Sequence, residues 1–207
     1  MIDYPFLPEN RQFKFVTHDH PFMLIAELAR HECSGDSLYP VGAVLVKDEN
    51  VVARSGNGFN RGRGKRHVCP RVVQECSSGT GYELCSLHDS AGHAEAMLIK
   101  VAREKGIDPS GGDVYLFGHW WCCESCWKTM INAGIRDVYL VDDADERFSR
   151  DRVYNETLSG HRTDVKVEQD GNMYRVYVPE SNEPVYTFEA ETKTDADRYL
   201  KNIIRQL

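Results

Sequence analysis

The 207-residue sequence predicts an α/β protein of three layers, in which helices cover both faces of a central mixed sheet. The first observation is a set of short apolar segments that predict strands at 41–46, 51–54, 113–117 and 137–141. The second is that helical patterns lie before and between most of these strands. The third is a change of pattern near residue 159, beyond which a small C-terminal α+β appendage is expected.

The elements at the start of the chain follow from local patterns. Residues 1–19 have mixed charge and no sustained period, so they predict either an arm lying over the domain or a disordered tail. From His20 to Cys33 apolar residues recur at helical spacing and Gly35 follows as a stop, which predicts the first helix. The next two strands are joined by a polar turn at 47–50 and predict a hairpin.

The expected domain organisation has three parts. Residues 1–19 are the arm, residues 20–158 form the main domain, and residues 159–207 form the C-terminal extension. Residues 55–92 are too long for an ordinary loop and are interpreted as a functional insertion. In the extension, Thr192 and Thr194 are candidate caps of a closing helix. The strands expected before that helix are Asp164–Glu168, Tyr174–Val178 and Pro184–Phe188.

Composition excludes several classes of protein. No segment approaches the roughly 20 apolar residues that span a bilayer, so no membrane partner is expected. Seven cysteines, an odd number, fit free thiols and metal sites in a reducing compartment, which predicts a soluble cytoplasmic protein. The net charge of −7 argues against a polynucleotide partner. Within this acidic chain, the segment from Arg54 to Arg71 is locally basic and has no acidic residue.

Four residues at two predicted helix starts carry the chemistry. His93, Cys123 and Cys126 offer one imidazole and two thiolates, three of the four ligands of a tetrahedral zinc ion, so the fourth position stays open for catalysis. Glu95 is not needed as a ligand, and its carboxylate can therefore act as a general base. Cys122 and Cys126 form a rival ligand pair, since they lie one helical turn apart.

These residues resemble a known family. His93-Ala94-Glu95 followed by Cys123-Glu124-Ser125-Cys126 is similar to the H-x-E…P-C-x-x-C pattern of the zinc-dependent cytidine and deoxycytidylate deaminases. The departure is Cys122, which stands where that family usually has proline. The resemblance implies a cytidine-deaminase-like fold for about residues 20–145, a catalytic Zn²⁺ and a homo-oligomer, either a dimer or a hexamer. It also implies that the backbone N–H of Ala94 donates to the carbonyl of the base.

The insertion suggests a nucleotide substrate. The stretch from Asn57 to Gly62 is similar to the one that follows the second strand in deoxycytidylate deaminases, where the asparagine holds the sugar; a plain Asn-Gly turn is the alternative. Arg61, Lys65 and Arg66 are candidate phosphate ligands, against the alternative of a solvated basic loop. Trp121 is a candidate wall of the base pocket, although core packing explains it equally well.

The same insertion is rich in soft metal ligands. Cysteines and histidines at this density predict a second, structural zinc site, against the alternative of buried free thiols. Its candidate ligands are Cys69, Cys76, Cys85 and one of the two histidines His67 and His88.

Together these observations predict a zinc-dependent deaminase that converts a free cytosine deoxynucleotide, with dCMP to dUMP and ammonia as the expected reaction. One alternative is a deaminase of another substrate: a modified dCMP, dCTP, cytidine or adenosine in tRNA. The other is a zinc-stabilised binding protein without activity. The presence of Glu95 argues against that class, because a structural zinc site needs no unligated carboxylate.

Overall fold

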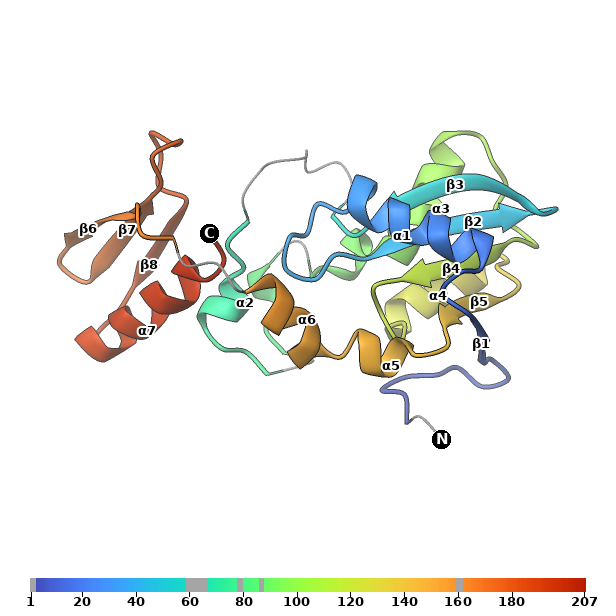
Figure 1. The fold of residues 1–207 in the computed structure, drawn as a ribbon, viewed down its shortest axis with the longest axis horizontal. Helices are drawn as coiled ribbons and strands as arrows, with labels where there is room; N and C mark the ends of the chain where they lie inside the picture. The colour runs from blue at the N-terminus through green and yellow to red at the C-terminus, as the bar shows by residue number, and fades with distance from the viewer. Residues whose placement is uncertain (1–2, 59–66, 78–79, 86–87, 159–161) are drawn as a thin grey trace. The chain divides into compact units, whose positions relative to one another are not determined.

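A computed structural model describes residues 3–58, 67–77, 80–85, 88–158 and 162–207 of the chain (Figure 1). The chain divides into two compact units. The first unit comprises Met1–Arg63 and Leu87–Tyr154, and the second comprises Gly64–Ser86 and Asn155–Leu207. The segment 64–86 therefore groups with the C-terminal part of the chain, a partnership that no local pattern in the sequence predicts.

The first unit is built on one five-stranded mixed sheet, as the sequence predicts. Its strands in spatial order are β1 (Phe13–Val16), β5 (Val138–Val141), β4 (Asp113–Phe117), β2 (Gly42–Lys47) and β3 (Asn50–Gly56). The pairs β1–β5 and β5–β4 are parallel, whereas β2 runs antiparallel to both β4 and β3. The predicted hairpin is thus the β2–β3 pair at one edge of the sheet.

Strand β1 was not predicted. It lies within residues 1–19, and it pairs in parallel with β5 in the register Phe13 to Val138. Phe13 is buried, and its ring lies 5.2 Å from that of Trp127. A four-residue strand is too short to show a period, and its partner strand lies far away in sequence.

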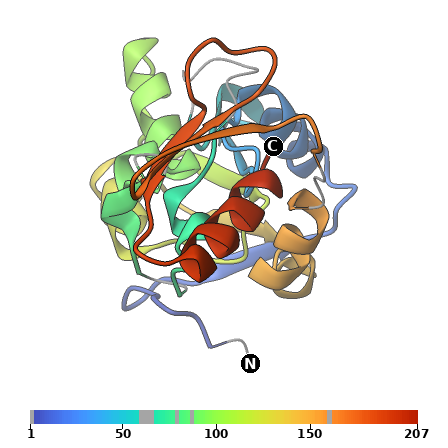
Figure 2. The ribbon, with the colours of Figure 1, turned by 90° about the vertical axis from the view of Figure 1, so that its left-hand side faces the viewer.

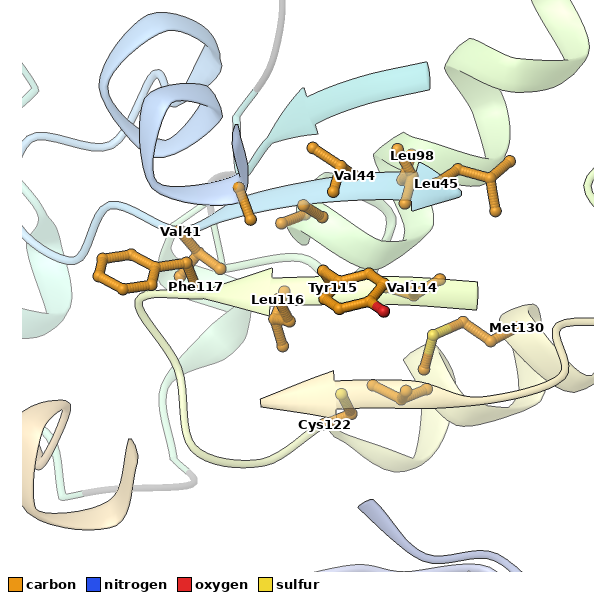
Figure 3. Packing of buried hydrophobic residues seen from close by; sticks show 14 of the residues in the cluster. Val41, Val44, Leu45, Leu98, Val114, Tyr115, Leu116, Phe117, Cys122 and Met130 are labelled. Atoms are coloured by element: carbon orange, nitrogen blue, oxygen red, sulfur yellow. The ribbon is translucent and has the colours of Figure 1, made fainter. Parts of the chain in front are cut away.

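Helices cover both faces of this sheet, which confirms the predicted three-layer fold. Helix α1 (Pro21–Cys33) packs on one face, and α3 (Ala94–Glu104) packs on the other, beside α4 (Glu124–Asn132). Gly42 explains how closely α1 approaches β2, because a Cβ there would lie 2.2 Å from the carbonyl oxygen of Ala26. Figure 3 shows apolar side chains filling the layers around β2 and β4, among them Leu98 of α3 and Met130 of α4.

Shorter elements complete the first unit. These are a 3₁₀ turn at Ser90–Gly92, helix α5 (Ala144–Arg147) and the start of helix α6 (Arg150–Thr157). Across the described ranges of both units, no helix combines the length and the apolar character needed to cross a membrane.

The second unit joins the segment 64–86 to the C-terminal extension (Figure 2). The extension forms the antiparallel sheet β6 (Lys166–Asp170), β7 (Met173–Tyr177) and β8 (Tyr186–Glu189), followed by α7 (Lys193–Ile204). The appendage is thus α+β, as expected. The 64–86 segment adds the short helix α2 (Pro70–Val73) and a 3₁₀ turn at Tyr82–Leu84.

Among the residues that the structure describes, the buried apolar cluster of the second unit is small. It consists of Val68, Val73, Val176 and Ile203, with half-buried side chains around it. A buried amide adds to it, because Asn202 donates from its side chain to the carbonyl of Val73 at 3.3 Å. Segment 64–86 and helix α7 are therefore joined both by this apolar cluster and by polar contacts.

Candidate metal centre and active site

Two helix starts bring the predicted catalytic residues into the first unit. His93 is the residue that precedes α3, and Glu95 lies in the first turn of that helix. Cys123 precedes α4, and its sulfur accepts the backbone N–H of Cys126 at 3.5 Å. The first N–H groups of a helix have no partner within the helix, so they favour negative charge at these positions. Both helix starts were predicted from the sequence.

Three ligand atoms converge here. Nδ1 of His93 lies 3.4 Å from Sγ of Cys123 and 3.5 Å from Sγ of Cys126, and all three atoms lie within 4.8 Å of one another. Zinc bonds of about 2.3 Å to sulfur and about 2.0 Å to nitrogen in a tetrahedral site place an S and an N ligand about 3.5 Å apart. The spacing and the donor set therefore fit one zinc ion, with a fourth position not supplied by these three residues.

A further hydrogen bond orients the His93 ring. Nδ1 faces the two sulfurs, and the ring is also hydrogen-bonded to the backbone of His88. A metal-binding histidine commonly donates its second ring N–H in this way, which fixes the tautomer and the ring plane. Although burial disfavours the imidazolium, the contact with Cys123 and the charge of Glu95 outweigh it, and they raise the pKa of His93.

The pKa values of the two thiols are shifted in opposite directions. A hydrogen bond from Cys126 and the interaction with His93 together lower the pKa of the Cys123 thiol to about 4. The same interaction, together with burial, raises the pKa of Cys126. One sulfur thus carries a negative charge before any cation binds, and a bound cation favours loss of the remaining thiol proton.

Glu95 is buried beside these ligands, with 6% of its surface exposed. Burial raises the pKa of its carboxyl, while the charge on His93 opposes that shift. A carboxylate with a raised pKa both accepts and returns a proton readily near neutral pH. The sequence gives the identity of this residue, but only the structure gives its burial.

Cys122, the residue that departs from the family pattern, is fully buried. Its side chain interacts with the Glu95 carboxylate, and burial raises the pKa of the thiol. It does not belong to the group of converging ligand atoms, which consists of His93, Cys123 and Cys126. The geometry therefore favours Cys123 over Cys122 as the partner of Cys126.

Aromatic side chains lie next to the cysteine motif. Trp121 is half-buried, and its ring lies 5.6 Å from that of His119, which also contacts Tyr39 at 5.4 Å. Nδ1 of His119 accepts the backbone N–H groups of Trp120 and Trp121. Burial and the charge of His93 lower the pKa of His119 to about 3, so this ring is neutral. One ring of His119-Trp120-Trp121 was predicted to stack on the base or wall the pocket, but nothing in the sequence indicates that His119 is buried and neutral.

Asn57 is buried, and its amide makes four hydrogen bonds within the protein. Its oxygen accepts the hydroxyl of Ser34 at 2.7 Å and the N–H of Val41 at 2.8 Å. Its nitrogen donates to Asp36 at 3.2 Å and to the carbonyl of Tyr39 at 2.9 Å. In this structure Asn57 anchors the loop between α1 and β2, so a sugar contact through its side chain would require exchanging one of these bonds.

Two further predictions concern the base contact at Ala94 and the phosphate ligands. Ala94 is the first residue of α3, and its carbonyl accepts the hydroxyl of Ser55 at 2.8 Å, which ties this helix start to β3. The predicted phosphate ligands Arg61, Lys65 and Arg66 lie outside the described residues.

A second group of soft ligands lies in the second unit. Ligand atoms of His67, Cys69 and Cys85 all lie within 4.8 Å of one another. Cys76 belongs to the same unit but not to this group, and His88 belongs to the first unit. Three of the five residues predicted for a second site therefore come together.

Comparisons with known proteins agree with the chemistry of the first site. The model of the cytidine and deoxycytidylate deaminase zinc-binding region matches residues 16–142. ComE operon protein 2 of Bacillus subtilis is 28% identical over 105 residues, and the match covers 50% of this chain and 48% of that protein. The chain thus matches about half the length of this curated relative.

Two solved structures are also similar. The dCMP deaminase of cyanophage S-TIM5 is 22% identical with a TM-score of 0.39, covering 61% of this chain and 86% of that one. A structure from work on A-to-I editing by tRNA:A34 deaminases is 27% identical with a TM-score of 0.37, covering 58% and 75%. The family assignment depends on the family model, whose match spans more than half of the sequence and contains both helix starts. The chain therefore belongs to the cytidine and deoxycytidylate deaminase family.

Proposed function

We propose that this chain is a zinc-dependent deaminase of a free cytosine deoxynucleotide, with conversion of dCMP to dUMP and ammonia as its reaction. The observation that carries the proposal is a buried carboxylate, Glu95, that interacts electrostatically with three converging metal-ligand atoms. A structural zinc site needs four ligands and no spare carboxylate, whereas a hydrolytic site needs an open position and a base.

His93, Cys123 and Cys126 would hold the zinc ion. When bound, the ion would lower the pKa of a water molecule towards neutrality, so that loss of a proton would give a hydroxide able to attack the base. The half-buried Cys123 and the buried Cys126 present their sulfurs from one helix turn, so the ligand geometry is fixed by α4 rather than by a loop. The His88 backbone keeps the His93 ring in place.

Glu95 would move the protons. As water adds its oxygen to C4 of cytosine, the Glu95 carboxylate accepts a proton and delivers it to the ring nitrogen. The second proton of the water passes by the same route to the exocyclic amine, the C4–N bond breaks, and ammonia leaves. Burial supports this role, because it raises the pKa of Glu95 and keeps bulk water from competing for the proton.

The choice of a nucleoside monophosphate depends on the basic segment. Arg61, Lys65 and Arg66 follow Asn57 in an otherwise acidic chain, and such side chains suit one phosphate group better than a polynucleotide. We propose that they bind the 5′-phosphate. Trp121 and the backbone N–H of Ala94 are the proposed contacts for the base.

The proposal is tested by measuring ammonia release from dCMP, dCTP, deoxycytidine, cytidine and adenosine-bearing RNA. We expect Glu95→Gln to lower kcat by about 10²–10⁴-fold, because general acid–base catalysis is lost. Its zinc content should stay unchanged. Glu104→Gln is the matched control, since Glu104 is exposed at the end of the same helix. Unchanged kcat in Glu95→Gln would refute the catalytic role.

The substrate class is tested separately. Replacing Arg61, Lys65 and Arg66 together by alanine should raise KM for dCMP without changing turnover of deoxycytidine, which has no phosphate. The matched control replaces three exposed cations of α3 and the turn after it, Lys100, Arg103 and Lys105. If activity fell equally with dCMP and with deoxycytidine, these residues would not recognise the phosphate.

A further inference from the structure

The second unit contains a group of side chains that the proposed deamination does not use. Nε2 of His67 lies 3.2 Å from Sγ of Cys85, and Cys69 is hydrogen-bonded through its sulfur to Cys85. The three ligand atoms are mutually within 4.8 Å. Cys69 and Cys85 are buried, with 0% and 3% of their surface exposed, and His67 is half-buried.

The donor set selects the cation. Two sulfurs and one imidazole nitrogen suit Zn²⁺ and exclude Mg²⁺ and Ca²⁺, which prefer oxygen. The N–S distance of 3.2 Å is a few tenths of an ångström shorter than the about 3.5 Å expected around zinc, so a small outward movement of one side chain would admit the ion. In the same segment, the sulfur of Cys76 lies beside Gly81 and does not belong to this group.

The site lies where polar contacts join the segment 64–86 to α7. Cys69 immediately precedes α2, and its backbone N–H donates to the side chain of Gln206 at 2.7 Å. Asn202 of α7 donates to the carbonyl of Val73 at the other end of α2. The ligands thus lie in the segment that α7 packs on, within a unit whose buried apolar cluster has four residues among those the structure describes.

We propose that His67, Cys69 and Cys85 bind a second zinc ion, separate from the catalytic one, whose role is to fold the 64–86 segment against the C-terminal extension. Each ligand comes from that segment, so the ion closes it into a fixed shape that α7 then covers. Metal binding contributes directly to folding where the apolar core is too small to do so. This inference does not depend on the deaminase proposal, because its ligands are not those of the catalytic site.

The first test measures the number of zinc ions bound per chain. Wild-type protein prepared with reductant should contain about two zinc ions per chain, and Cys69→Ser/Cys85→Ser about one. Cys123→Ser/Cys126→Ser should also contain about one. Cys33→Ser is the control and should retain both, since Cys33 ends α1 in the first unit and belongs to neither ligand group. Two ions bound in Cys69→Ser/Cys85→Ser would overturn the proposal.

The second test does not require the Cys69 variant to fold. Cys123→Ser/Cys126→Ser, with only the proposed second site intact, is stripped of metal and titrated with Co²⁺. Cobalt–thiolate charge-transfer absorption that saturates at one ion per chain is expected, together with slower hydrogen exchange in β6–β8 and α7. A Cys69–Cys85 disulfide in the reduced preparation, or the absence of cobalt–thiolate bands, would contradict the site.

Discussion

The two units of the chain are stabilised in different ways. In the first, a five-stranded sheet is covered by helices on both faces, and one continuous apolar cluster includes residues of α1, α3, α4 and all five strands. In the second, a three-stranded sheet and the helices α2 and α7 surround a small apolar cluster among the described residues, and β6 is largely exposed. The comparison shows that polar groups have different tasks in the two units. In the first unit the buried polar groups include Glu95 and the amide of Asn57, whereas in the second Asn202 joins α7 to α2.

The two groups of metal-ligand residues lie in surroundings that differ in the same way as the two units. His93 and Cys123 lie at the starts of helices whose inner faces pack in the large core, so the core supports their backbone positions. His67, Cys69 and Cys85 lie in a segment with little regular structure. A catalytic site benefits from such rigid support, whereas a structural site can provide the support itself.

The largest expected effect tests the core of the first unit. Trp127→Ala should lower the free energy of unfolding by about 3–5 kcal/mol, because it removes the largest fully buried side chain, which contacts Phe13. Urea unfolding, with hydrogen exchange in β2 and β4 as the readout, measures this loss of stability. Trp127→Phe is the control: the indole nitrogen has no hydrogen-bond partner in the described part of the chain, so this change loses only packing. Equal losses in both variants would argue against the core explanation.

Asn57→Ala should lower the free energy of unfolding by roughly 3 kcal/mol, because the Val41 N–H and other buried partners lose their hydrogen bonds. Thermal unfolding measures this loss. The sugar contact expected from the sequence makes a different prediction, a raised KM with unchanged stability. Asn132→Ala is the control, since Asn132 is exposed at the end of α4, and surface changes stay within about 0.5 kcal/mol.

The sequence predicts the fold of the first unit well for physical reasons. Strands β2, β4 and β5 are largely buried and apolar, and the helices that begin after His93 and Cys123 carry apolar residues at helical spacing. These signals are local. Strand β1 was missed because its structure depends on pairing with β5, more than a hundred residues further along the chain.

The parts of the site that escaped prediction depend on contacts between distant segments. The four partners of Asn57 lie in the loop from Ser34 to Val41, so its buried position is invisible in the Asn-Gly motif. The Cys122 contact with Glu95 and the neutral state of His119 likewise require the folded chain. Residue identities were predictable, whereas their burial and hydrogen-bond partners were not.

A matched pair of substitutions compares the two units directly. Ile99 in the first unit and Ile203 in the second are both fully buried, with 1% and 0% exposed. Ile99→Val and Ile203→Val each remove one methyl group and should each cost about 1 kcal/mol. Hydrogen exchange should show the loss in all amides of the first unit for Ile99→Val, but only in β6–β8 and α7 for Ile203→Val. Loss of protection in β4 from Ile203→Val would mean that the two units unfold together.

The smallest expected effect concerns the cap of α7. Thr192 accepts the backbone N–H of Asp195 at 3.1 Å, and its hydroxyl donates to the Asp195 carboxylate at 2.7 Å. Thr192→Ala should therefore cost about 1 kcal/mol, whereas Thr194→Ala, at an exposed position inside the helix, should be close to neutral. In a unit with so small a core this loss is a large fraction of the local stability, so α7 should exchange its amide hydrogens several-fold faster while β2 and β4 stay unchanged. Equal exchange rates in the two threonine variants would contradict the assignment of Thr192 as the cap.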